Sequence, residues 1–112
     1  MRLLNKKILE KIKRKNKGNV SLVKAIDKLI EDIDKSAWED QNELNKTRPD
    51  ADRVHTDGFY FFDMNVHRTM ILIEFSDKEA TVVWAGTHQE YEMVFRNNRN
   101  TIKNWLKSND WI

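Results

Sequence analysis

The chain has 112 residues, of which 39% are hydrophobic and 34% are charged, and its formal net charge is +2. These values are typical of one soluble globular domain, and they predict a single domain over residues 1–112. No apolar run reaches the roughly 18 residues of a membrane span, and the start lacks the apolar region of a signal peptide. Because the chain has no cysteine, disulfides and thiolate metal sites are excluded, and we expect a cytoplasmic protein.

Charge is distributed unevenly along the chain. Residues 1–28 contain ten Lys or Arg and two acids, whereas residues 29–63 contain four Lys or Arg and ten acids. A basic end beside an acidic middle is consistent with a surface that binds phosphates. The alternative is a set of solvated helix faces whose charges pair with each other.

The first third of the chain predicts one strand and two helices. Residues 2–4 can form a short strand. Apolar residues spaced by one, three and four positions predict a helix over residues 6–17. A longer apolar stripe predicts a second helix from Ser21, its expected N-cap, to about Ser36. Two consecutive amphipathic helices joined by a short turn predict a helical hairpin.

Residues 37–58 are polar and irregular, contain Pro49 and end in Gly58. We expect a long surface loop here, and such loops are often functional. Basic side chains alternate with acids in this segment, so it can either contact RNA or pair internally. The candidate RNA-binding residues are Lys46, Arg48, Arg53 and His55.

The second half of the chain predicts three strands, at residues 59–63, about 67–75 and about 80–85. Their nearly continuous apolar runs indicate a sheet that is covered on at least one face. Helices are expected at residues 89–97 and 101–108. The order of elements predicts an α+β domain, in which an N-terminal helical hairpin packs on a small, mainly antiparallel sheet and a C-terminal helix follows.

The stretch from Gly86 to Tyr91 contains a His and a Tyr where a strand ends and a helix begins. If Thr87 caps this helix, His88 and Tyr91 share one helical face and can act as an acid–base pair. The alternative is that His88 caps the helix and Tyr91 packs on the sheet edge. Spacing alone favours this second interpretation.

Arg68 opens the central strand, just before its apolar residues. An Arg at a sheet edge can clamp a phosphate with its planar set of donors, or it can form an ion pair with Asp63 or Glu74. The three His residues do not have the spacing of metal ligands, so we expect no metal site. The chain contains neither a Gly-rich phosphate loop nor a Gly-x-Ser-x-Gly elbow.

These features together resemble the HigB-type toxins of bacterial toxin–antitoxin pairs, within the RelE-like superfamily. The resemblance rests on "HRTMILIEF", in which Arg68 opens an apolar strand, on the following strand "ATVVWAG", and above all on "GTHQEY" at residues 86–91. It extends over nearly the whole chain except the C-terminal tail. The fold that it implies is RelE-like.

The resemblance implies a ribosome-dependent mRNA endonuclease that uses no metal or other cofactor. The 2′-hydroxyl of the RNA would attack the adjacent phosphate, so the substrate must be RNA. Arg68 would steady the phosphate, while His88 and Tyr91 would move protons or orient the nucleotide. Many RelE-like nucleases carry Lys on the strands beside this phosphate, but residues 59–63 contain none, which leaves the general base open.

The implied partners are mRNA, the ribosome and a small helix-turn-helix antitoxin similar to HigA, with no membrane contact and with DNA contacted only through the antitoxin. We expect the basic first helix to bind ribosomal RNA through Lys11, Lys13 and Arg14, with an affinity that falls as salt rises. The alternative function is a non-catalytic module that binds RNA or protein, in which His88 and Tyr91 only stack or pack.

Overall fold

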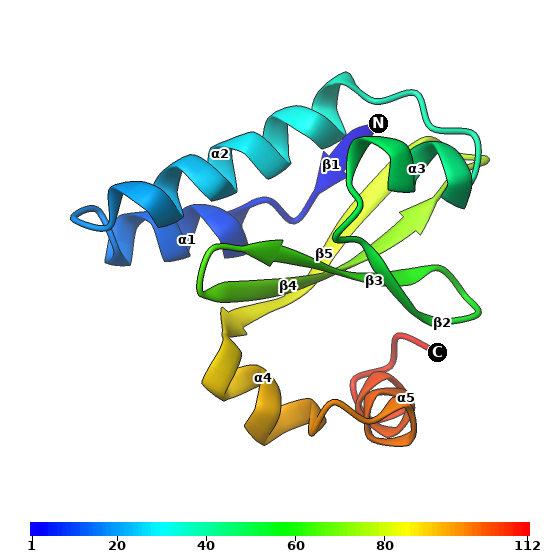
Figure 1. Cartoon of the computed structure of the whole chain (residues 1–112). Helices are drawn as coiled ribbons and strands as arrows, with labels where there is room; N and C mark the ends of the chain where they lie inside the picture. Colours follow the sequence, from blue (N-terminus) through cyan, green and yellow to red (C-terminus); the bar gives the residue numbers. More distant parts are fainter.

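The computed structural model describes all 112 residues as five helices and one five-stranded sheet (Figure 1). The strands are β1 (Arg2–Leu4), β2 (Asp52–His55), β3 (Phe59–Met64), β4 (His67–Glu74) and β5 (Glu79–Thr87). The helices are α1 (Lys7–Lys15), α2 (Val20–Lys35), α3 (Gln41–Thr47), α4 (His88–Phe95) and α5 (Arg99–Ser108). The α+β class predicted from the sequence is therefore correct. The longest helix has 16 residues and many charges, and none of the five has the length and apolar composition of a membrane span.

The strands are ordered β1-β5-β4-β3-β2 across the sheet. Neighbours from β2 to β5 are antiparallel, whereas β1 runs parallel to β5 at the sheet edge. The sheet is thus mixed and mainly antiparallel. The short strand predicted at residues 2–4 is confirmed as β1, so a helical hairpin as the N-terminal element is not confirmed, and α1 and α2 follow this strand.

Helices cover both faces of the sheet (Figure 1). Side chains of β3 alternate between the two faces, since successive residues of a strand point in opposite directions. Tyr60 and Phe62 pack in one core with the first three helices, while Phe59 and Phe61 pack in a second core with α4 and α5. β3 is apolar on both sides because each of its faces is covered by one of the two cores.

The long loop expected over residues 37–58 is wrong, because α3 and β2 lie within it. α3 begins after Asp40, whose carboxylate accepts the backbone N–H of Glu43 at 3.0 Å. Leu44 is its one buried residue, so the segment shows no periodic apolar stripe. The boundary of α2 also differs from the prediction, since Asn19 caps it in place of Ser21.

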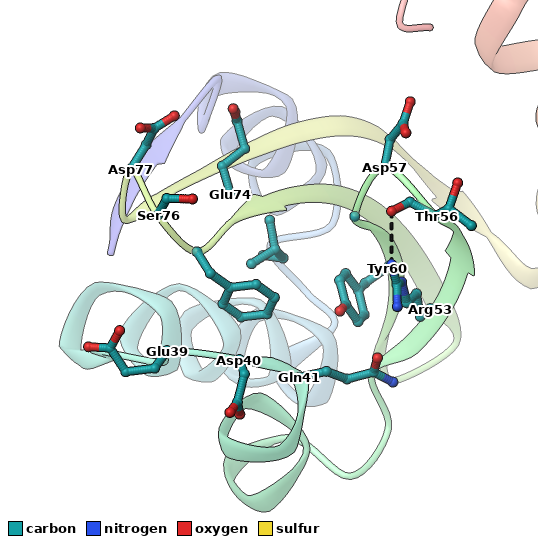
Figure 2. A pocket seen from close by; sticks show the side chains of 13 residues that line it. Glu39, Asp40, Gln41, Arg53, Thr56, Asp57, Tyr60, Glu74, Ser76 and Asp77 are labelled. Atoms are coloured by element: carbon teal, nitrogen blue, oxygen red, sulfur yellow. Dashed lines mark hydrogen bonds between the residues drawn. The ribbon is translucent and has the colours of Figure 1, made fainter.

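An acidic pocket of about 450 Å³ lies at the sheet end where the β2–β3 and β4–β5 turns meet the start of α3 (Figure 2). The five carboxylates that line it are those of Glu39, Asp40, Asp57, Glu74 and Asp77, and Arg53 is the only basic residue among the lining side chains. The opposite end of the sheet, where β4 begins and β5 ends, carries the side chains that were singled out for chemistry.

Candidate active site

The end of β5 passes directly into α4 at Thr87. The Thr87 hydroxyl accepts the N–H of Glu90 at 3.0 Å, and the Glu90 carboxylate accepts the N–H of Thr87 at 2.8 Å. This reciprocal capping box pairs two backbone donors that a helix start would otherwise leave free. Of the two residues considered as the cap, Thr87 is the N-cap and His88 is the first residue of the helix, and the box fixes how the first turn of α4 leaves the sheet.

His88 and Tyr91 lie in different surroundings although they are three residues apart. His88 is exposed, and its backbone N–H donates to the carbonyl of Val66 at 3.1 Å, which ties α4 to the β3–β4 turn. Tyr91 is only 3% exposed, and its ring centroid lies 4.9 Å from that of Phe61. The Tyr91 hydroxyl donates to the Asn97 side-chain oxygen at 2.9 Å. The imidazole is thus available to a substrate, whereas the phenol is anchored within the protein.

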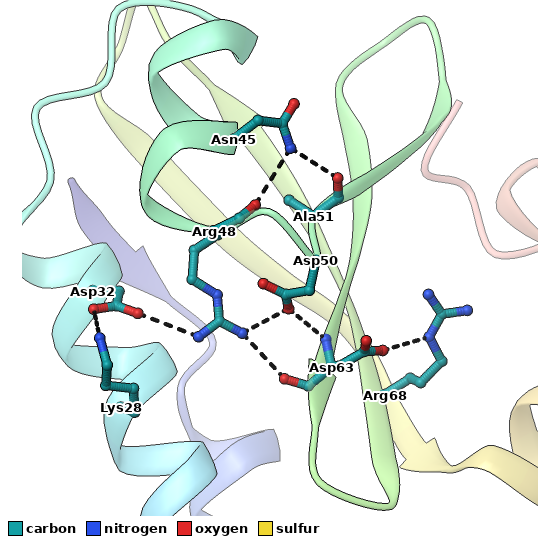
Figure 3. Close-up of polar contacts among 8 residues, drawn as sticks. All are labelled: Lys28, Asp32, Asn45, Arg48, Asp50, Ala51, Asp63 and Arg68. Atoms are coloured by element: carbon teal, nitrogen blue, oxygen red, sulfur yellow. Dashed lines mark hydrogen bonds and ion pairs between the residues drawn. The ribbon is translucent and has the colours of Figure 1, made fainter.

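Arg68 lies between Asp63 and Tyr91. Its Nε donates to the Asp63 carboxylate at 3.2 Å, and its guanidinium carbon lies 4.5 Å from the centroid of the Tyr91 ring. The side chain is 14% exposed, its ion pair with Asp63 uses Nε, and its terminal nitrogens, which point away from Asp63 in Figure 3, form no ion pair with a carboxylate. A guanidinium held by stacking and by one ion pair is pre-oriented to bind an anion.

Tyr91 is poorly suited to accept a proton. Burial raises the pKa of its hydroxyl, and the positive charge of Arg68 opposes this shift only in part. Its phenol therefore stays protonated near neutral pH, where it can orient Arg68 or donate a hydrogen bond. The general base must be sought elsewhere, and the two His residues at this end of the sheet are the available candidates.

His67 is a candidate that the sequence analysis missed. It pairs with Thr87 across the β4–β5 ladder, is 8% exposed, and its Nδ1 is buried without a hydrogen-bond partner. Burial lowers the pKa of the imidazole, the nearby His88 lowers it further, and the carboxylate of Glu90 raises it. The alternation of β4 was the available signal, because it directs His67 to the face opposite Arg68.

His67 lines a cleft of about 550 Å³ between α1 and the β5–α4 junction. The polar residues around it are Lys11, Lys15 and Asn16 on one side and His67, Thr87 and Glu90 on the other. This end of the sheet therefore presents two features that suit an anion, the terminal nitrogens of Arg68 on the α4 face and a cleft with two lysines on the α1 face.

We expect the free energy of unfolding to fall as the pH drops below about 6.5, the ordinary pKa of His. The folded protein disfavours the charged imidazole of His67, so in this range the unfolded chain binds more protons and is favoured by acid. Urea unfolding at a series of pH values would measure this loss. A His67→Gln variant should lose less stability than the wild type between about pH 7 and pH 5, the range around the ordinary pKa of His. Equal losses in both would contradict this expectation.

Arg48, predicted to contact RNA, is held in a network that joins α2, α3 and β3 (Figure 3). Its guanidinium donates to Asp32 at 3.2 Å, to Asp50 at 2.7 Å and to the carbonyl of Asp63 at 3.1 Å. The side chain is 12% exposed. These contacts engage both terminal nitrogens, and Nε has no partner but is buried, so none of the three nitrogens is open to a phosphate.

The other predicted RNA-binding residues are dispersed. Arg53 donates to the carbonyl of Thr56 at 2.8 Å and lines the acidic pocket, and Nδ1 of His55 accepts the N–H of Asp57 at 3.1 Å. Lys46 is exposed on α3. The structure therefore does not bring these residues together with Arg68.

The basic residues of α1 divide between two sides of the helix. Lys11 lines the cleft beside His67, whereas Lys13 forms an ion pair with Asp27 of α2. Arg14 is exposed and lines a shallower pocket on the α2 side. Of the three residues predicted to bind ribosomal RNA, only Lys11 is near the β4–β5 end of the sheet.

The family model of the HigB toxin, described as the RelE-like toxic component of a toxin–antitoxin system, matches residues 22–94. This span is well over half of the chain, and it contains the strands β2 to β5 together with Arg68, His88 and Tyr91. Comparison with curated proteins yields no match. The chain belongs to the HigB toxin family and is the RelE-like toxic component of a toxin–antitoxin system, as the resemblance predicted.

Proposed function

We propose that this toxin is an endonuclease that cleaves mRNA on the ribosome without a metal ion. The observation that carries the proposal is Arg68, whose terminal nitrogens are held in place by Tyr91 and Asp63 at the sheet end where His88 is exposed. Cleavage that uses the RNA 2′-hydroxyl as nucleophile needs charge stabilisation and proton transfer, which these side chains can supply.

In the proposed reaction, the 2′-oxygen attacks the adjacent phosphorus and the bond from phosphorus to the 5′-oxygen breaks. Arg68 binds the non-bridging oxygens and stabilises their growing negative charge. His88 takes part in proton transfer, since an imidazole can both accept and donate a proton. Tyr91 positions Arg68 through its ring. The products are a 2′,3′-cyclic phosphate and a free 5′-hydroxyl.

Membership of the family implies an antitoxin partner. We propose that this partner is a helix-turn-helix protein similar to HigA, that it silences the nuclease in the cytoplasm, and that the toxin reaches DNA only through it. The exposed residues Lys11, Arg14 and Lys46 remain in the proposed ribosome-binding surface, together with Lys13, His55 and Arg53, of which Arg53 lines the acidic pocket. Arg48 is left out because its terminal nitrogens are engaged.

The proposal is tested with purified protein and a translated mRNA. Replacing His88 with Ala should reduce the cleavage rate about a hundredfold or more, the usual contribution of a general acid or base. The side chain is exposed, so the fold should persist. Gln89→Ala, in the same exposed turn, is the matched control and should cleave at the wild-type rate. Equal cleavage by the two variants would contradict the role of His88.

A second function, a module that binds RNA or protein without chemistry, is favoured by one observation. The Tyr91 hydroxyl is already bonded to Asn97 and its ring is buried, as expected of a packing residue. In that case the wild-type protein would bind ribosomes or RNA and leave the mRNA intact.

A further inference from the structure

The cleft between α1 and the β5–α4 junction has two lysines on one wall. Lys11 and Lys15 are four residues apart, so they lie on the same side of the helix, and both line the cleft. Neither forms an ion pair with a carboxylate, in contrast to Lys13, which is bound to Asp27. Their ammonium groups are therefore available to an anion that enters the cleft.

The opposite wall contains the imidazole of His67. Its Nδ1 is sealed from solvent and has no partner, the ring forms no hydrogen bond with the protein, and the residue lines the cleft. Buried polar groups in folded proteins are nearly always hydrogen-bonded, so an unpaired imidazole that is 8% exposed points to a ligand.

The remaining charge in the lining is the carboxylate of Glu90. It is engaged by the backbone N–H of Thr87 at 2.8 Å, which directs it to the start of α4. Two lysines and a His thus face one carboxylate that is already paired. This balance favours a bound anion over a bound cation.

We propose that this cleft binds a backbone phosphate of the RNA, held by Lys11 and Lys15, with the imidazole of His67 as hydrogen-bond donor. The proposal rests on the proposed function for the identity of the substrate and deepens it by locating a second phosphate. His67 directly precedes Arg68 in β4, and their side chains point to opposite faces of the sheet. An RNA strand that passes this end of the sheet would place one phosphate at Arg68 and another in the cleft.

The protonation of His67 gives this site a pH dependence with a definite sign. Lys11 and Lys15 on α1 and His88 on α4 oppose a positive imidazole, whereas Glu90 and a bound phosphate favour it. Binding of the phosphate therefore raises the pKa of His67, and by linkage the affinity for RNA rises as the pH falls toward that pKa.

The experiment uses an oligoribonucleotide methylated at every 2′-oxygen, which the proposed reaction cannot cleave. Its binding is followed by NMR through the imidazole signals, which come from only three His residues. We expect the His67 signals to shift on binding and their midpoint of titration to rise. The Lys11→Ala/Lys15→Ala double variant should weaken binding and reduce the slope of log affinity against log salt by about 1, the effect of one lost phosphate contact.

The Lys17→Ala/Lys24→Ala variant removes the same charge from two exposed positions outside the cleft and is the matched control. Equal weakening by both double variants, or binding that leaves the His67 signals unmoved, would overturn the site. Inorganic phosphate is tested in parallel. If the His67 signals shift with inorganic phosphate but not with the oligoribonucleotide, the cleft binds free phosphate and the RNA proposal is overturned. If the His67 signals respond but the protein cleaves no mRNA, the nuclease proposal is contradicted and the phosphate site is supported. If the protein cleaves mRNA but the His67 signals do not respond, the phosphate site is contradicted and the nuclease proposal is supported.

Discussion

Replacing Arg68 with Ala is expected to reduce cleavage of translated mRNA by about a hundredfold to a thousandfold, the cost of removing one group that stabilises transition-state charge. Its guanidinium is held over the ring of Tyr91, and Nε is the nitrogen that pairs with Asp63, so the terminal nitrogens can bind a phosphate. Arg68→Lys keeps the charge but loses the planar set of donors, so we expect an intermediate rate. Single-turnover cleavage of a ribosome-bound mRNA measures both.

The control for Arg68 separates the guanidinium from its ion pair. Asp63→Asn removes the charge that Nε contacts but leaves the ring of Tyr91 beneath the guanidinium, so most of the activity should remain. Loss of the stacking contact in Arg68→Ala is worth about 0.5 to 2 kcal/mol, and thermal unfolding must show that the variant is folded at the assay temperature. A folded Arg68→Ala protein that cleaves at the wild-type rate would contradict the assignment.

Replacing Arg48 with Ala is expected to lower the free energy of unfolding by about 3 kcal/mol. The change leaves Asp32, whose side chain is 10% exposed, and Asp50 without their shared cation. Removing one partner of a buried ion pair costs about 3 to 5 kcal/mol, and the lower end applies here because Lys28 also contacts Asp32. Urea unfolding of wild type and variant measures the difference.

Lys46→Ala is the matched control for Arg48, since it removes a basic side chain that is exposed on the neighbouring α3. A surface substitution of this kind should change stability by about 0.5 kcal/mol or less. The result that would contradict this prediction is an Arg48→Ala protein that is as stable as Lys46→Ala but binds ribosomes less well. Arg48 would then contribute to RNA binding rather than to stability.

The three central strands were predictable because each has enough apolar residues to fill both cores. The run from Phe59 to Phe62 has no polar residue, which is characteristic of a strand covered on both faces. The start of α4 was also predictable, since Thr87 and Glu90 have the spacing of a capping box. In both places the local sequence pattern predicts the same structure that the packing of the folded protein produces.

The segment between α2 and β3 could not be predicted, because its structure depends on distant contacts. α3 is held by the burial of Leu44, and β2 exists because it pairs with β3 at the sheet edge. The ion pair between Arg48 and Asp32 joins residues sixteen positions apart and has no sequence signature. The pattern of a polar segment with few apolar residues therefore predicts a loop, even where tertiary contacts make it a helix or an edge strand.

At the candidate site, too, some features follow from local sequence patterns and others depend on distant contacts. The contact between Arg68 and Asp63 was one of two pairings proposed, and it follows from their direct opposition across the β3–β4 hairpin. The burial of Tyr91 depends on Phe61 and Phe95, and the second of these lies on the same helix one turn further on. His67 could not be identified from the sequence, because a His at the start of a strand matches no motif. Its place in a cleft becomes visible only when α1 is packed beside the β5–α4 junction.

The central claim is that this toxin cuts mRNA, and mapping of RNA 5′ ends in cells tests it most directly. Wild type and Arg68→Ala would be expressed from a tightly controlled promoter at equal levels of folded protein. We expect new 5′-hydroxyl ends within translated reading frames for wild type and their absence for the variant. An unchanged set of ends in cells that contain folded wild-type protein would contradict the nuclease and favour the binding module.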